Sequence, residues 1–225
     1  MLSAVAPVLV PGLADITQIA TGPRHSLALT RDGHVWSWGA NHSGELGLGT
    51  RLTGWTPAVV PGLDRIVAIA AGATSNNGVS GAVRDDGTVR MWGTNASGMI
   101  GNGQSNPAPD GPGGRVLVPA QVQGLTGARQ LSIGAGHVAA VLGDGTVRMW
   151  GHNGYGQLGL GTTVPYEPRP VKVAALTNVA AVHLGSMRSY AITADGRFWV
   201  WGFGDSQTRG LLARHLHVPT LLELP

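Results

Sequence analysis

The sequence predicts an all-β fold, a β-propeller of four tandem blades, from a repeated dipeptide, a repeated turn and a glycine-rich composition. Trp-Gly occurs four times, at steps of 54, 58 and 51 residues, and an Asp-Gly pair begins six residues before each tryptophan. A period of this length is typical of a solenoid or a propeller. The Trp-Gly pairs begin at Trp38, Trp92, Trp150 and Trp201, and the Asp-Gly pairs begin at Asp32, Asp86, Asp144 and Asp195.

The composition agrees with many short strands joined by tight turns. Of the 225 residues, 36 are glycine, and only 12% are charged, about half the usual share. The formal net charge is +3, and the arginines are spread along the chain without a basic run. Because a nucleic-acid-binding protein concentrates its positive charge on one face or stretch, we expect no nucleic-acid partner.

The absence of cysteine excludes disulfides, thiolate catalysis and cysteine-based zinc sites. This absence favours a reducing compartment, so we expect a cytoplasmic protein, with a secreted form of a longer protein as the alternative. The first residues lack the basic region of a signal peptide. No apolar stretch approaches 18 residues, so we expect no membrane partner.

The repeated unit predicts strands that are buried on both faces. Asp-Gly between two apolar runs indicates a hairpin, here between strands His25–Thr30 and His34–Trp38. In the second strand, Val35 and Trp38 lie on opposite faces. Apolar side chains on both faces are expected in propeller blades, because each sheet packs between two others.

A glycine-rich loop follows each Trp-Gly pair, and a segment led by proline opens each unit. Asn41, Asn95 and Asn153 share one position in this loop, where asparagine can cap the local backbone. The fourth copy, from Gly202, lacks the asparagine. We predict one propeller domain, 1–225, with repeats at approximately 7–56, 57–118, 119–169 and 170–218 and a partial repeat at 219–225.

These landmarks resemble the regulator of chromosome condensation repeat family. The matching residues extend from Gly22 to Gly49 and read GPRHSLALTRDGHVWSWGANHSGELGLG. The resemblance implies four-stranded blades around a central shaft, usually seven of them. It also implies a choice of roles: nucleotide exchange on a small GTPase, ultraviolet-B sensing, inhibition of a bacterial enzyme, or scaffolding. Pro23 stands where the photoreceptor pattern has tryptophan, which argues against light sensing.

Four repeats cannot form seven blades, so three arrangements remain open. The chain forms a partial ring, a closed four-bladed ring, or part of a ring that a second chain completes. An open arc would expose two apolar sheet faces, and such faces usually find a partner. We therefore expect self-association through the end blades as one possibility.

Two departures from the repeat are the candidate partner-binding sites, because irregular loops on a rigid scaffold often carry function. The insertion Gln104–Val118 lengthens the second unit, and Asp110 and Arg115 are its charged contacts. Trp55 lies in a loop outside the tryptophan register, where an aromatic side chain can anchor a protein partner.

No motif indicates catalysis, a cofactor or a metal. The sequence contains no GxSxG, HExxH or P-loop pattern, and no βαβ unit follows Gly154–Gly159, which matches GxGxxG. His25 and His137 recur on separate blades, so we expect structural hydrogen bonds from them. We predict a non-enzymatic protein–protein interaction module, with guanine-nucleotide exchange on a small GTPase or inhibition of a bacterial enzyme as alternatives.

Overall fold

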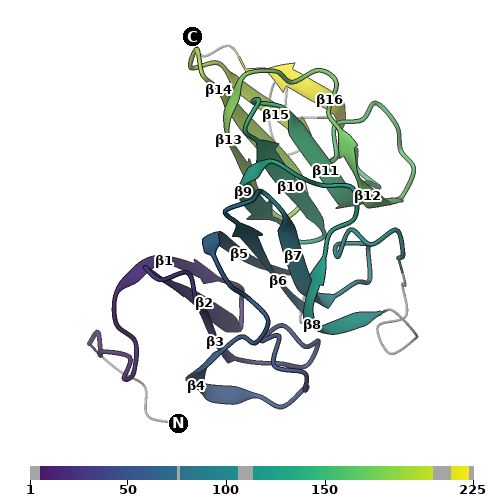
Figure 1. Cartoon of the computed structure of the whole chain (residues 1–225). Coiled ribbons are helices and arrows are strands. Elements are labelled where there is room, and N and C mark those ends of the chain that lie inside the picture. The colour runs from purple at the N-terminus through teal and green to yellow at the C-terminus, as the bar shows by residue number, and fades with distance from the viewer. Residues whose placement is uncertain (1–5, 75–76, 106–113, 205–213, 223–225) are drawn as a thin grey trace.

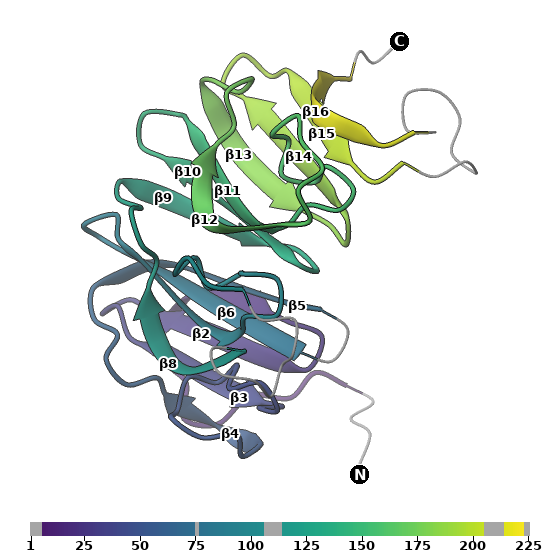
Figure 2. The same ribbon diagram turned by 90° about the vertical axis from the view of Figure 1, so that its right-hand side faces the viewer.

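The computed structural model describes residues 6–74, 77–105, 114–204 and 214–222. Within them the chain forms four antiparallel sheets, each made of four consecutive strands. Figure 1 shows the sheets following one another from the N-terminal to the C-terminal end, and Figure 2 shows the same order from the side. The predicted all-β fold of four propeller blades is therefore confirmed.

The sixteen strands divide evenly among the four sheets. The first sheet contains β1 (Ile16–Thr21), β2 (His25–Thr30), β3 (Val35–Gly39) and β4 (Gly54–Val59). The second contains β5 (Ile66–Thr74), β6 (Asn77–Arg84), β7 (Val89–Thr94) and β8 (Arg115–Gln121). The third contains β9 (Ala128–Ile133), β10 (His137–Leu142), β11 (Val147–His152) and β12 (Tyr166–Lys172). The fourth contains β13 (Val179–Leu184), β14 (Arg188–Thr193), β15 (Phe198–Gly202) and β16 (Leu216–Leu221).

The Asp-Gly pairs form the hairpin turns that the sequence predicts. In the first sheet, Gly33 has φ of +83° and donates its N–H to the carbonyl of Thr30 at 3.0 Å. Glycine adopts this left-handed backbone without the steric cost that a Cβ atom would add. Strand β2 has the predicted bounds, and β3 begins one residue later than predicted.

The sheets are offset from the sequence repeats by one strand. The segments led by proline were expected to open each repeat, but they supply the last strand of the sheet before it: Pro57, Pro119, Pro170 and Pro219 lie in β4, β8, β12 and β16. The earliest such segment, from Pro7, precedes β1 and is not part of any sheet.

Each sheet has a leading face, which is directed toward the preceding sheet, and a trailing face, which is directed toward the next. The buried core lies in three layers between consecutive sheets. Contacts between sheets are sequential, and the first and fourth sheets lie at opposite ends (Figure 1). The described part of the chain is therefore not a closed four-bladed ring but a partial one, and completion of the ring by a second chain stays a prediction. No helix in that part is long and apolar enough to cross a membrane.

Candidate functional site

The three junctions between consecutive sheets share a hydrogen bond from the later tryptophan to the glycine-rich loop of the earlier sheet. At the first junction, the indole N–H of Trp92 donates to the carbonyl of Glu45 at 2.9 Å. The other two bonds, both 2.8 Å, join Trp150 to Met99 and Trp201 to Gln157. All three indoles are completely buried. A buried indole needs such an acceptor, so the loop is part of the junction.

A buried asparagine fixes each of the three loops. Asn41 accepts a hydrogen bond from the N–H of Leu46 at 3.0 Å and donates to the carbonyl of Thr50 at 2.9 Å. Asn95 and Asn153 make the corresponding bonds. The predicted role of these asparagines as caps of the local backbone is therefore confirmed, and the loop carbonyls are held in place for the indoles.

Two histidines bridge the first and third junctions. The Nε2 atoms of His25 and His137 lie 2.9 Å from the Oγ atoms of Ser80 and Ser189. Ser80 donates its single hydroxyl proton to the carbonyl of Glu45 at 2.8 Å, so His25 donates its Nε2–H to the serine. The predicted structural role of these histidines is confirmed.

Burial keeps both histidines neutral. It lowers the pKa of His25 to about 4, and burial together with the neighbouring His152 lowers the pKa of His137 to about 3. The Nδ1 atom of His137 is buried and has no hydrogen-bond partner among the described residues. A proton there would be a buried charge without an acceptor, which is costly.

The leading face of the first sheet has apolar residues in the same register as the other three, but no sheet in the described part of the chain covers it. Ile19 in β1 is 71% exposed, and its neighbour across the hairpin is Ala28. The residues in the same register, each opposite an alanine of the next strand, are 1–6% exposed: Ile69, Leu131 and Val182. The leading face of the first sheet is therefore an apolar surface exposed to solvent.

Two tryptophans enlarge this surface. Trp38, which corresponds to the buried Trp92, is only partly buried, and Trp55 in β4 is 76% exposed. Trp55 stands two residues before Pro57, and Leu117 of the second sheet stands two residues before Pro119. Leu117 lies beside Gly44 in the glycine-rich loop of the first sheet. On the same face of the first sheet, Ile16 is 36% exposed and Trp36 is partly buried. We call Ile16, Ile19, Trp36, Trp38 and Trp55 the open face.

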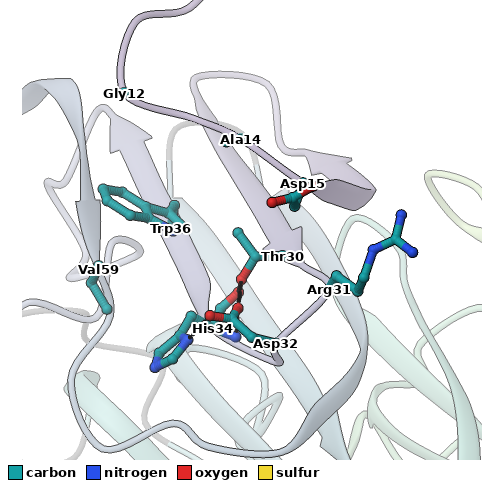
Figure 3. A pocket seen from close by; sticks show the side chains of 9 residues that line it. All are labelled: Gly12, Ala14, Asp15, Thr30, Arg31, Asp32, His34, Trp36 and Val59. Atoms are coloured by element: carbon teal, nitrogen blue, oxygen red, sulfur yellow. Dashed lines mark hydrogen bonds and ion pairs between the residues drawn. The ribbon is translucent and has the colours of Figure 1, made fainter.

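A cleft of about 650 Å³ lies beside the open face, and Trp36 forms part of its wall. Figure 3 shows Trp36 and Val59 on one side and the Asp-Gly turn with Asp32 and His34 below them. The side chain of Arg31 points away from the other residues (Figure 3). The cleft therefore combines an aromatic wall with two carboxylates, those of Asp15 and Asp32.

The carboxylate of Asp32 is held by its own turn. Hydrogen bonds from Thr30 and then from His34 lower the pKa of Asp32 to about 2. In the next two blades, hydrogen bonds from Thr88 and Thr146 hold the pKa of Asp86 and Asp144 below the ordinary value. Carboxylates bonded within their own turns in this way are turn residues, and their lowered pKa does not suit a general acid.

The structure describes two of the three residues that the sequence singled out for partner binding. Arg115 is the first residue of β8 and therefore not a loop residue, and Trp55 lies in β4, also outside a loop. Asp110 lies outside the described residues. The role of these three residues in partner binding stays a prediction.

Sequence reasoning missed Ile19 and Ile16 as surface residues. In the other three sheets, the residues in the same register are buried. The only feature of the sequence that could have indicated the exposure of Ile19 and Ile16 is their position in the first repeat. Among residues 6–74, 77–105, 114–204 and 214–222, no group of acidic, histidine or cysteine side chains could hold a metal ion.

Four consecutive sheets, three of which press a buried indole onto a glycine-rich loop of the sheet before, define a repeat-type β-propeller. Two models of the regulator of chromosome condensation (RCC1) repeat match the chain, one over residues 16–45 and 128–157 and the other over residues 32–76 and 144–192. The chain belongs to the RCC1 repeat family.

Its relatives are longer proteins. The chain is 33% identical to the human E3 ubiquitin-protein ligase HERC2 over 97% of its own length, which is 5% of HERC2. It is 31% identical to the ultraviolet-B receptor UVR8 of Arabidopsis thaliana, over 86% of the chain and 42% of the receptor. The chain thus spans less than half of either relative.

Solved propellers have the same fold. Yeast RCC1 (Prp20), in a crystal structure with Kap60, superposes with a TM-score of 0.80 at 24% identity, over 96% of this chain and 50% of that protein. Human WBSCR16 superposes with a TM-score of 0.75 at 26% identity, over 93% of this chain and 53% of that one. These likenesses establish the propeller fold and assign no partner to this chain.

Proposed function

We propose that the chain is a non-enzymatic protein–protein interaction module whose binding surface is the open face of the first sheet. One observation carries this proposal: Ile19 is 71% exposed, although the residues in its register on the other three sheets are buried. An apolar surface that adjoins exposed tryptophan is typical of a protein interface, since tryptophan is enriched among the residues that dominate binding energy.

The proposal agrees with the lack of a catalytic motif in the sequence and with the protein partner bound by yeast RCC1. That partner is a property of the yeast protein. Nucleotide exchange and enzyme inhibition stay predictions from the family resemblance, because a fold does not by itself choose among the functions of its members.

The test compares partner recovery by matched variants. A protein recovered with the immobilised chain should be lost with the double variant Ile19→Ser and Trp55→Ser. It should be retained with Val118→Ser, which changes an apolar residue of the second sheet that is 50% exposed. It should also be retained after deletion of residues 106–113. If the double variant retains the partner and the deletion variant loses it, the binding surface is the insertion and not the open face.

A further inference from the structure

The connections between strands lie at two opposite rims of the sheets. Because each sheet is antiparallel, the glycine-rich loop after its third strand lies at the same rim as the turn before its second strand. Gly98 in one of these loops lies beside Pro168 near the start of β12, so the rims of successive sheets coincide. We call this rim, which contains residues 40–53, 95–105 and 153–165, the loop rim. The Asp-Gly turns lie at the opposite rim, which we call the turn rim.

The turn rim has charges of both signs that neutralise one another. Arg84 donates to the two carboxylate oxygens of Asp64 at 2.6 and 2.8 Å, and the guanidinium of Arg65 lies 3.5 Å from the carboxylate of Asp85. Every aspartate that the structure describes lies at this rim: Asp15, Asp32, Asp64, Asp85, Asp86, Asp144 and Asp195.

The loop rim carries arginines without such counter-ions over the third and fourth sheets. Arg169 and Arg214 are exposed, and a Cβ atom at Gly103 in the second loop would lie 2.8 Å from Nε of Arg169. Arg188 donates its Nε–H to the carbonyl of Phe203 at 2.6 Å. Within residues 6–74, 77–105, 114–204 and 214–222, none of the three arginines forms an ion pair.

The acidic residues described at the loop rim do not balance these arginines. Glu45 is 1% exposed and accepts the N–H of Ser43 at 2.7 Å, and Glu167 accepts the backbone N–H of Arg169 at 3.3 Å. The loop rim of the third and fourth sheets therefore has an excess of positive charge, which attracts anionic groups.

Aromatic and imidazole rings gather beside these arginines. The ring centroid of Tyr155, in the third loop, lies 5.9 Å from that of His152 and 5.2 Å from that of Phe203. Tyr166 lies 5.5 Å from His152, and His215 lies 5.1 Å from Phe203. We call these five residues the ring cluster, and all of them are half-buried or exposed. Because the rings pack against one another, they form a surface and not a cage around a small ligand.

The ring cluster is not needed to fold a glycine-rich loop. Tyr155 corresponds to Ser43 in the first loop and to Ser97 in the second, and His152 corresponds to Thr94. Both serines are buried, whereas Tyr155 is partly exposed. The first two loops thus form the same structure without the rings, which leaves the exposed rings of the third loop free to serve another purpose.

We propose that the ring cluster, together with Arg169, Arg188 and Arg214, binds an acidic segment of a protein partner. Carboxylates of the segment pair with the arginines, and an apolar side chain of the segment packs on Tyr155. Tyrosine, phenylalanine and arginine are enriched in protein interfaces, and arginine binds carboxylates in a bidentate geometry. A nucleic-acid strand would need a longer track of positive charge than three arginines. This surface goes beyond the proposed function, because it lies at the loop rim and does not include the open face.

The test measures the affinity of a fluorescein-labelled peptide made of repeated Asp-Asp-Leu units, by fluorescence anisotropy at low salt. We expect the double variant Arg169→Glu and Arg214→Glu to raise the Kd by ~10-fold or more, because it replaces attraction by repulsion. The matched control is the double variant Arg24→Glu and Arg31→Glu, which makes the same change of net charge at exposed positions of the first sheet. The control should change the Kd by less than ~3-fold.

A second variant tests the ring cluster. Tyr155→Ser introduces the residue that the other two loops have, so the fold should be retained, as urea unfolding would show. We expect Tyr155→Ser to raise the Kd of the peptide by ~5-fold or more. It should not change the Kd of a peptide that has serine in place of leucine.

Three results would overturn the inference: no binding of the peptide by the wild-type chain, equal weakening by the control, or no effect of Tyr155→Ser. A single-stranded thymidine oligonucleotide that binds more tightly than the peptide, and that Tyr155→Ser releases, would make nucleic acid the partner and also overturn it. The double variant Ile19→Ser and Trp55→Ser should bind the peptide as the wild type does. Recovery of a partner through the open face therefore succeeds or fails independently of the peptide.

Discussion

The leading faces of the first and third sheets have similar side chains and opposite surroundings. Trp38 corresponds to Trp150, and Ile19 corresponds to Leu131. The third sheet buries its pair completely or nearly so, whereas Ile19 is 71% exposed and Trp38 is partly exposed. The sequence repeat therefore determines which side chains lie on a leading face. Whether those side chains are buried or exposed depends on the presence of a preceding sheet.

The largest expected difference between these two faces is in the cost of removing the indole. We expect Trp150→Ala to lower the free energy of unfolding by about 3–5 kcal/mol, because it removes a fully buried side chain and leaves a cavity. We expect Trp38→Ala to cost less than half as much, since its indole is partly in water already. Urea unfolding of both variants measures the difference, and equal losses would contradict the comparison.

The loop asparagines give the next largest effect. We expect Asn153→Ala to cost about 1–3 kcal/mol, because the N–H of Leu158 and the carbonyl of Thr162 lose the side chain that satisfies them. Asn102→Ala serves as the control, since Asn102 accepts one hydrogen bond at an exposed turn. Urea unfolding should show a smaller loss for the control, and a larger one would show that the buried asparagines do not hold the loops.

The buried histidines make the covered junctions sensitive to acid. Because burial lowers the pKa of His137 to about 3, the unfolded chain binds a proton near pH 6.5 that the folded chain does not bind. As the pH is lowered from 6.5 to about 3, the free energy of unfolding should therefore decrease by ~1.4 kcal/mol per pH unit for this histidine. The same holds for His25 from 6.5 to about 4.

Urea unfolding at several pH values tests this dependence. The variant His137→Gln should have a flatter dependence between pH 6.5 and 4 than the wild type. His183→Gln, at an exposed position of the fourth sheet, should leave the slope as it is. A slope that neither variant changes would show that the bridging histidine is not responsible.

The smallest expected effect on stability belongs to the open face itself. We expect Trp55→Ser to change the free energy of unfolding by less than about 0.5 kcal/mol, as is usual for exposed positions. Within the proposed function, the same substitution weakens partner binding. A thermal shift measurement beside a binding measurement separates the two effects, and a large loss of stability would show that Trp55 packs within the chain.

Much of the fold was predictable because its signals are local. The Asp-Gly turns and the alternation of Val35 and Trp38 depend on backbone preferences and on the two-residue period of a strand. The assignment of the segments led by proline was not predictable in this way. A sequence repeat has no natural starting point, so only the pairing of Ala58 with Ser37 shows that such a segment completes the preceding sheet.

The candidate site was predictable only in part. Trp55 stood out because it departs from the repeat, whereas Ile19 has the register of a buried residue and gives no sign of exposure. The sequence by itself determined the strands, the turns and the apolar character of both sheet faces. Only the tertiary structure decided which of those faces is covered, because burial depends on a neighbouring sheet that lies about fifty residues away along the chain.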